Sequence, residues 1–246
     1  MLRNATAPDL LELLDTGSAG DLDFYNQYAR HCGGPVLVLM CGTGRVAISI
    51  ARQGVPVMGL DAEAATVELA RRKAVQMGAT RAMFVQGNPA HFVSESKHPL
   101  VLIPGGGLLQ LLTQEEQRAC LMAIRQSLQV GGKLVLDLPL LDPERRAETG
   151  PVMRRAGDRV ALLRTFRKFD TARQLQEELV ECQWVDQHGM VVQSQCAVMS
   201  TRYATPGETV LLLEVCGFRT VCFGGFDRES LLPGATRLVI EAERNR

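Results

Sequence analysis

Short, mostly apolar runs alternate with helix-like segments between residues 35 and 138, and this pattern constrains the fold more than any other feature of the sequence. Strands that are apolar on both sides must be covered on both faces, as happens when parallel strands are joined by helical crossovers. Such crossovers are right-handed and build a doubly wound sheet. We therefore expect an α/β fold with a mostly parallel, Rossmann-like sheet, whose strands are residues 35–40, 55–60, 81–87, 99–104 and 133–138.

Three helices are expected between these strands. Residues 45–54 and 62–78 each end at a glycine, which is a common stop signal for a helix. The third helix follows Thr113, and Glu116 stands three residues further on, as in a capping box. The Val-Gly-Gly segment at 130–132 is expected to turn the chain from this helix into the last strand.

The pattern changes after Pro139. Residues 140–157 are polar and rich in turn-forming residues, and three long segments with partial alternation follow them. Partial alternation of this kind predicts antiparallel strands, and Asp186–Gly189 has the composition of a hairpin turn between the last two. The three segments are residues 159–169, 174–186 and 190–203.

The first pattern resumes with a helix at 207–217 and two strands at 218–226 and 236–243. We therefore divide the chain into a Rossmann-like domain, residues 1–138 and 204–246, and an inserted antiparallel region. The insertion, residues 139–203, is interpreted as a sheet that caps the substrate site.

Composition narrows the function classes. The chain has 246 residues with 27 basic and 27 acidic side chains, and a net charge of zero argues against nucleic acid as the partner. The seven cysteines lie mostly in apolar runs and are expected to be buried, reduced thiols. The four histidines lack ligand spacing, so no metal site is expected. Neither a membrane span nor a signal peptide is evident, and we expect a cytoplasmic protein.

The first strand leads into a candidate ligand site. Ligands of open parallel sheets bind beyond the carboxyl ends of the strands, where the strand order reverses. Here the first strand ends in a glycine loop, residues 40–44 (Met-Cys-Gly-Thr-Gly), and Asp61 follows the second strand. Glycine lets the backbone approach a ligand closely, and a carboxylate after the second strand can accept hydrogen bonds from a ribose diol. The two features together predict an adenosine-containing ligand.

At this point the chain resembles class I S-adenosylmethionine-dependent methyltransferases, and in the insertion it is similar to the small-molecule N-methyltransferase subgroup. The resemblance rests on residues 36–63, 112–138 and 205–221, and residues 24–35 look like the N-terminal helix that covers the cofactor. It implies S-adenosylmethionine as cofactor. The positions that it assigns to cofactor binding are Tyr25, Cys41, Gly42, Thr43, Gly44, Asp61, Ala62, Asn88, Pro89 and Ile103.

The sequence departs from the family pattern at three positions. Val38 stands where the family usually has an acid that helps to hold the methionine end of the cofactor. Met40 replaces the first glycine of the loop, and Asn88 replaces an aspartate that accepts a hydrogen bond from the adenine amino group. An amide oxygen can still accept that bond, so Val38 is the sharper departure.

Catalytic residues are harder to identify, because methyl transfer from a sulfonium depends mainly on positioning. Tyr25 is expected either to direct its hydroxyl at the ligand or to pack the first helix on the sheet. Gln110 faces the acceptor or simply begins a helix, and Asp137 orients an amine or stabilises the turn before Pro139. The candidates at the end of the insertion are Arg202 and Tyr203, with a solvated strand end as the alternative.

Three functions are compatible with these observations. The first is methyl transfer from S-adenosylmethionine to nitrogen or oxygen of a small polar metabolite, as in secondary metabolism. The second is a protein of the same fold that no longer methylates, and acts in elimination or cyclisation or as a subunit of a hetero-oligomeric enzyme. The third, a nicotinamide dehydrogenase, is disfavoured because the loop lacks the third glycine of the dinucleotide fingerprint. The expected partner is a small-molecule substrate, with a homodimer or hetero-oligomer as the assembly, and neither nucleic acid nor a membrane.

Overall fold

The computed structural model describes residues 8–140, 149–156 and 159–245. Its contacts divide the chain into two units. The parallel-sheet unit is Gly17–Leu140 with Ala204–Arg246, and the antiparallel unit is Met1–Thr16 with Leu141–Tyr203.

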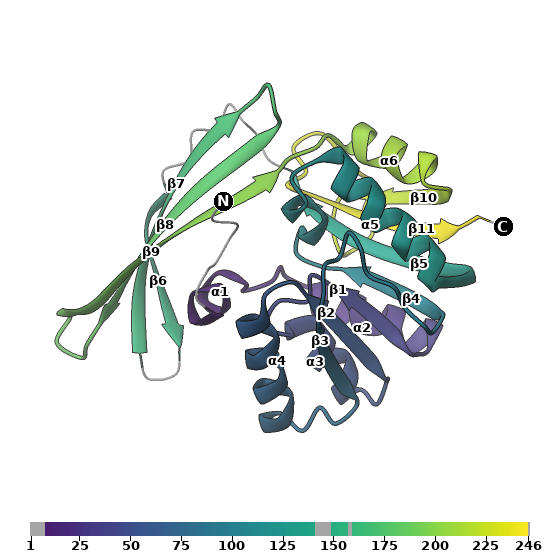
Figure 1. The fold of residues 1–246 in the computed structure, drawn as a ribbon. Helices are drawn as coiled ribbons and strands as arrows, with labels where there is room; N and C mark the ends of the chain where they lie inside the picture. The colour runs from purple at the N-terminus through teal and green to yellow at the C-terminus, as the bar shows by residue number, and fades with distance from the viewer. Residues whose placement is uncertain (1–7, 141–148, 157–158, 246) are drawn as a thin grey trace. The chain divides into compact units, whose positions relative to one another are not determined.

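The parallel-sheet unit has a seven-stranded sheet in the order β10-β11-β5-β4-β1-β2-β3 (Figure 1). All neighbouring pairs from β5 to β3 are parallel, and β11 is antiparallel to both β5 and β10. The expected mostly parallel, doubly wound sheet is therefore confirmed. Its strands are β1 Val36–Leu39, β2 Val57–Asp61, β3 Ala82–Gln86, β4 His98–Ile103, β5 Leu128–Pro139, β10 Phe218–Phe223 and β11 Arg237–Arg244.

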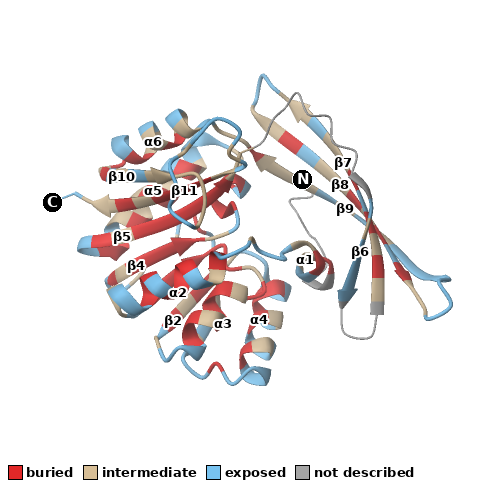
Figure 2. Ribbon diagram, turned by 180° about the vertical axis from the view of Figure 1, so that it is seen from behind, coloured by how far each residue is buried: buried red, intermediate tan, exposed pale blue. Residues whose placement is uncertain are grey.

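Helices cover both faces of this sheet, and Figure 2 shows the central strands buried along their length. One core cluster joins the sheet to α2, α3 and α4, and the other joins it to α5, α6 and the short 3-10 helix η1. β1 is apolar and buried along its whole length, and β4 and β5 carry apolar runs into both cores, which is why the sequence alternates as it does. The helices are α2 Asp21–Cys32, α3 Arg45–Arg52, α4 Ala64–Gln76, η1 Gly107–Gln110, α5 Gln114–Ser127 and α6 Pro206–Val215.

Local signals set several of the element ends. Thr113 accepts a hydrogen bond from the Glu116 N–H at 3.1 Å, and the Glu116 side chain accepts one from the Thr113 N–H, so the capping box is confirmed. At the other end of α5 the expectation was wrong. Leu128 already begins β5, and the glycines at 131 and 132 lie inside the strand, where its pairing with β4 shifts register.

The antiparallel unit has a four-stranded sheet in the order β6-β7-β8-β9, whereas the sequence predicted three strands. The additional strand, β6 Thr149–Ala156, falls in the stretch that was expected to be turn-rich, because its alternation is interrupted by Gly150 and Pro151. Residues 141–148 of that stretch lie outside the described residues. The other strands are β7 Arg159–Asp170, β8 Leu175–Val185 and β9 Val191–Arg202.

A seven-residue helix, α1 Pro8–Leu14, also belongs to the antiparallel unit. Leu10 and Leu13 pack in one cluster with residues of β7 and β8, among them Trp184. This apolar contact is the reason that the N-terminal residues group with the antiparallel sheet, although the sequence-based division placed them with the Rossmann-like domain. The hairpin between β8 and β9 turns at Asp186–Gly189 as expected, with the Gly189 N–H donating to the Asp186 carbonyl oxygen at 3.0 Å.

Candidate active site

The glycine loop follows β1 at the carboxyl edge of the parallel sheet. β1 lies between β2 and β4, so the strand order reverses at this loop. Gly42 has a φ of 55°, and a Cβ added to it would meet no atom within 4 Å, which leaves open space over the loop. Gly44 has a φ of 88°, and a Cβ there would lie 2.9 Å from the Phe84 ring. The first glycine thus leaves room for a ligand, and the second makes room for the packing of β3.

Asp61, the last residue of β2, holds this loop in place. Its Oδ2 accepts a hydrogen bond from the Gly42 N–H at 2.8 Å, and its Oδ1 accepts one from the Glu63 N–H at 3.1 Å. Each carboxylate oxygen has two acceptor sites, so both oxygens retain acceptor capacity toward a diol. The sequence-predicted pair of glycine loop and acid is therefore brought together in the structure.

Thr43 and Cys41 are both turned into the protein. The Thr43 hydroxyl accepts a hydrogen bond from the Lys73 ammonium of α4 at 3.1 Å. The Cys41 side chain is buried, and burial together with the nearby Asp61 charge raises the pKa of its thiol far above the ordinary value. A thiol held in its protonated form is a poor nucleophile, so Cys41 contributes packing and backbone shape to the loop.

Met40 changes the loop in a way that its neighbour accommodates. Its φ of 47° lies in the left-handed region, which a residue with a Cβ adopts at a cost of about 1–2 kcal/mol. A Cβ on Gly107 would lie 3.0 Å from the Met40 Cβ and 3.0 Å from Ile103. The triple glycine at 105–107 is thus explained in part, because Gly107 makes room for the side chain that replaces the usual loop glycine.

The other two departures have different consequences. Val38 is completely buried in the core cluster that contains α2 and α3, so no polar group from this position reaches the site. Asn88 is exposed, and its Oδ1 accepts a hydrogen bond from the Ala90 N–H at 2.9 Å, which shapes the loop after β3. The amide oxygen expected to meet an adenine therefore already has one backbone donor.

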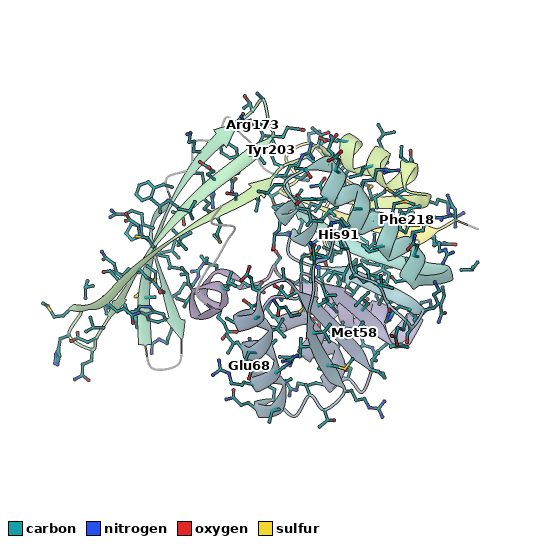
Figure 3. All side chains as sticks on the ribbon, in the orientation of Figure 1. Met58, Glu68, His91, Arg173, Tyr203 and Phe218 are labelled. Atoms are coloured by element: carbon teal, nitrogen blue, oxygen red, sulfur yellow. The ribbon has the colours of Figure 1, made fainter. Side chains whose placement is uncertain are left out.

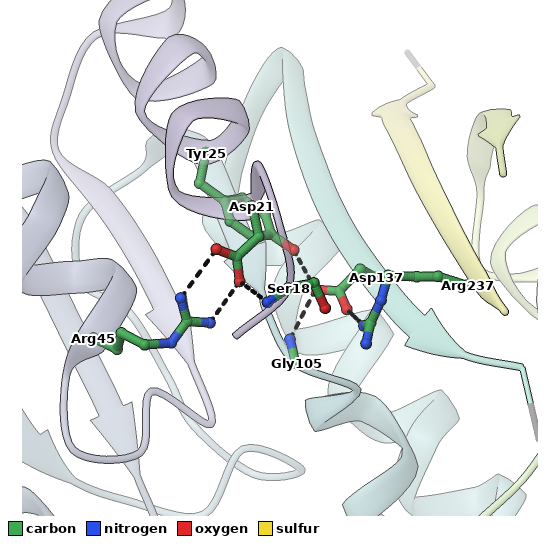
Figure 4. A network of polar contacts seen from close by, with 7 residues as sticks. All are labelled: Ser18, Asp21, Tyr25, Arg45, Gly105, Asp137 and Arg237. Atoms are coloured by element: carbon green, nitrogen blue, oxygen red, sulfur yellow. Dashed lines mark hydrogen bonds and ion pairs between the residues drawn. The ribbon is translucent and has the colours of Figure 1, made fainter. Parts of the chain in front are cut away.

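Asp137, near the end of β5, joins three elements (Figure 4). Its Oδ1 accepts hydrogen bonds from the Tyr25 hydroxyl of α2 at 2.5 Å and from the Gly105 N–H after β4 at 2.8 Å. Its Oδ2 accepts a charge-assisted bond from the Arg237 guanidinium of β11. Asp137 is 1% exposed and Tyr25 is completely buried. Two predicted site residues, Tyr25 and Asp137, are therefore in direct contact.

The electrostatics of this cluster follow from burial. Burial raises the pKa of Asp137, and the Arg237 charge and the three hydrogen bonds oppose that shift. The pKa of Tyr25 is raised by burial and by the neighbouring Asp137 charge, so its hydroxyl remains a donor. Asp137 thus acts as a clamp between α2, the loop after β4 and β11, and its orientation of an acceptor amine remains a prediction.

A second, partly buried pair ties the same helix to the glycine loop. Arg45, the first residue of α3, donates to both carboxylate oxygens of Asp21 at 3.1 and 2.7 Å, and the Ser18 N–H also donates to Asp21 at 3.0 Å. The positive charge of Arg45 at the N-terminus of α3 interacts unfavourably with the helix dipole, and the Asp21 carboxylate offsets this cost. A Cβ on Gly17 would lie 2.4 Å from the Arg45 guanidinium, which shows how closely the chain before α2 passes over it.

Four other residues were predicted for the site, namely Gln110, Ile103, Ala62 and Pro89. Gln110 ends η1 and is exposed, and the Ile103 side chain is buried in the core, so only its backbone can face a ligand. Ala62 is exposed, with its carbonyl oxygen accepting from Gln86, and Pro89 is buried in the loop after β3. These assignments remain predictions.

Arg202 and Tyr203 lie in the antiparallel unit. Arg202 is 4% exposed and donates to the Gln174 side chain at 2.5 Å, so it is not a solvated strand end. Tyr203 is labelled in Figure 3. Its ring packs edge-on against Phe169, with the centroids 5.7 Å apart. Both side chains have a local structural role, and their part in catalysis remains a prediction.

Sequence reasoning missed Asp21, Arg45 and Arg237. Arg45 and Arg237 carry no local motif, because their partners stand 24 and 100 residues away. A signal was available only for Asp21, which begins a helix at a position where acids are favoured.

The strand order, the glycine loop after β1 and the acid after β2 define the fold of class I S-adenosylmethionine-dependent methyltransferases. Residues 36–132 match the model of a family described as methyltransferase domain. Residues 36–132 therefore form a methyltransferase domain, as the resemblance implied, and S-adenosylmethionine is the cofactor that this domain implies. The open loop at Gly42 and the spare acceptor sites of Asp61 fit that cofactor.

Solved structures agree along nearly the whole chain. The CcbJ methyltransferase from Streptomyces caelestis is 25% identical, with a TM-score of 0.75 over 94% of this chain and 98% of that one. CalS10 from Micromonospora echinaspora, an amino pentose methyltransferase solved with S-adenosylmethionine, is 18% identical, with a TM-score of 0.75 over 96% and 95%. An S-adenosylmethionine-dependent methyltransferase from Clostridium acetobutylicum is 12% identical, with a TM-score of 0.81 over 97% and 96%.

A search of curated protein sequences finds no match to this chain. In the part of the chain that the structure describes, no helix is both long and apolar enough to cross a membrane.

Proposed function

We propose that this chain transfers the methyl group of S-adenosylmethionine to a nitrogen of a small polar metabolite, with amines carried on sugars as the first candidates. The observation that carries methyl transfer is the Asp61–Gly42 contact, which fixes an open glycine loop at the point where the strand order reverses. The preference for an amine is supported by two similar structures, an amino pentose methyltransferase and a sugar N-methyltransferase.

Each group of the site has a task in this proposal. Asp61 is placed to bind the ribose diol while it keeps the Gly42 backbone in position. The open space over Gly42 admits the cofactor close to the backbone. The bound cofactor supplies a methyl group on a sulfonium centre. Tyr25 and the Gly105 backbone, held by Asp137, shape the edge of the sheet beside that loop.

The acceptor amine must carry a lone pair to attack the methyl carbon, so it reacts in its unprotonated form and loses a proton afterwards. Asp137 is engaged by Tyr25, Gly105 and Arg237, so we do not assign it the removal of that proton. We therefore expect kcat/KM to rise with pH until the acceptor amine itself is deprotonated, and the profile to shift when an acceptor of different pKa is used.

Calorimetric titration with S-adenosylmethionine and S-adenosylhomocysteine tests the cofactor. The wild type is expected to bind both, and Asp61→Ala to abolish binding. Glu68→Ala is the matched control, because Glu68 is an exposed acid of the next helix that pairs with Arg71 at 3.6 Å. Absence of heat at millimolar ligand would refute methyl transfer and favour a protein of this fold that does not methylate.

The acceptor is tested separately with sugars that differ in one group. An amino sugar and the corresponding sugar with only hydroxyl groups are incubated with enzyme and cofactor, and the products are analysed by mass spectrometry. Methylation of the amino sugar alone is expected. Methylation of the hydroxyl sugar would overturn the nitrogen assignment while leaving methyl transfer intact.

A further inference from the structure

We infer that Arg237 is a positioning residue of the methyl-transfer site, which keeps Asp137 in the form that anchors both α2 and the loop after β4. This inference rests on the proposed function where cofactor binding is measured. Its second measurement, amide hydrogen exchange in α2, depends on the structure alone. The Arg237 guanidinium pairs with Asp137, and its effect on the site is transmitted through that carboxylate.

The position of Arg237 follows from the one antiparallel strand of the sheet. Because β11 runs against β5, its first residue lies beside the last residue of β5, with Arg237 paired to Pro139 and Val239 to Asp137. The β5 carboxyl end is the edge at which the ligand site lies. Antiparallel pairing therefore places the guanidinium at the same edge of the sheet as the Asp137 carboxylate.

Aromatic contacts fix Arg237 from its other side. Its guanidinium carbon lies 5.8 Å from the centre of the Phe226 ring, and that ring packs edge-on against Phe24 and Tyr25 of α2 at 5.4 and 5.8 Å. Phe226 belongs to the connection between β10 and β11. The arginine is thus held between a carboxylate and an aromatic face, which favours a single side-chain orientation.

The energetics show why the carboxylate needs this partner. An ion buried as deeply as Asp137 is strongly destabilised unless it is paired, so removing its cationic partner leaves an uncompensated buried charge. The other charges near the cluster do not replace Arg237. Asp21 carries the same sign as Asp137, and Arg45 is engaged by Asp21 with both of its terminal nitrogens.

Loss of Arg237 therefore changes the protonation of Asp137. A protonated carboxyl group has less acceptor capacity, so it holds the Tyr25 hydroxyl and the Gly105 N–H less strongly. Both anchors weaken together. The loop after β4 adjoins the glycine loop, since a Cβ added to Gly107 would lie 3.0 Å from the Met40 Cβ, so the loosened edge is the one that receives the cofactor.

The test combines four variants with two measurements. The variants are Arg237→Met, Arg237→Lys, Asp137→Asn and the double variant Asp137→Asn/Arg237→Met. The control is Arg219→Met, because Arg219 makes an exposed pair with Glu243 at 2.9 Å between β10 and β11. One measurement is the Kd of S-adenosylhomocysteine by calorimetry, and the other is amide hydrogen exchange across α2, which needs no ligand.

We expect Arg237→Met to raise the Kd at least about tenfold, which corresponds to about 1.4 kcal/mol, and to speed exchange in α2. Arg237→Lys keeps the charge and is expected to change the Kd by less than about threefold. In the Asp137→Asn background, Arg237→Met is expected to change neither measurement, because the amide has no charge to compensate. In the Arg237→Met variant the Kd is expected to improve with rising pH, as Asp137 loses its proton, whereas the double variant shows no such trend.

Two results would overturn the inference. The first is an Arg237→Met variant whose Kd and α2 exchange match those of Arg219→Met. The second is an equal effect of Arg237→Met with and without Asp137→Asn, which would mean that the arginine acts independently of the carboxylate. If Arg237→Met fails to fold, the Kd and the α2 exchange of Asp137→Asn are compared with those of the double variant. A difference between these two variants would overturn the inference. A wild type that binds no cofactor refutes the proposed function, while exchange in α2 continues to test the anchoring role.

Discussion

Gly44→Ala is expected to destabilise the parallel-sheet unit by more than the same substitution at Gly54, although the two glycines have nearly the same backbone. Their φ values are 88° and 85°, so the cost of about 1–2 kcal/mol for placing alanine in the left-handed region is common to both. At Gly54 an added Cβ meets nothing within 4 Å. At Gly44 it would lie 2.9 Å from the Phe84 ring and 3.1 Å from Ile48.

The difference between the two variants isolates the steric cost. Forcing a methyl group into a packed site costs about 1–3 kcal/mol, so Gly44→Ala should lose that much more free energy of unfolding than Gly54→Ala. Urea unfolding followed by the helical circular dichroism signal is the assay, because α2 to α6 all belong to this unit. Equal losses in the two variants, within about 0.5 kcal/mol, would refute the contact with Phe84 as the reason for Gly44.

Three more predictions concern separate features of the same unit. Thr113→Ala removes the acceptor of the α5 capping box and is expected to cost about 1 kcal/mol in urea unfolding, whereas Thr113→Ser should cost much less. Burial lowers the pKa of His98, so below the ordinary histidine pKa the unfolded state binds more protons than the folded state. The free energy of unfolding should therefore fall as pH drops through that range, and His98→Gln should flatten the dependence of the urea midpoint on pH. Arg45→Met and Asp21→Asn should each destabilise strongly but not additively in a double-mutant cycle, and additive losses would refute a direct pair.

The strands and helices of the parallel-sheet unit could be predicted because their signals are local. The apolar runs of β1 and β4 stand out against polar helix faces, and the Thr113–Glu116 box marks the beginning of α5 in four residues. The glycine loop and Asp61 were predictable for the same reason, since each follows a recognisable strand.

The missed features depend on contacts between distant segments. β6 has its alternation interrupted, and it is a strand because β7 supplies its hydrogen bonds. Tyr25 and Asp137 were both predicted site residues, but their contact could not be predicted, because 112 residues separate them. The same holds for Arg237, whose importance depends on the antiparallel direction of β11.

That direction also has a consequence for how the protein is made. β11 is added to the sheet beside β5 after about one hundred further residues, including the whole antiparallel sheet, have left the ribosome. Until then a nascent chain can assemble β1 to β5 and their helices, yet Asp137 has no cation beside it and is better kept hydrated or protonated. The pairing of β11 with β5 is slow, because the chain loses loop-closure entropy before the contacts between these distant strands can compensate for it. We therefore expect the site to form in a late folding step, in which Arg237 pairs with Asp137 and α2 packs on the sheet.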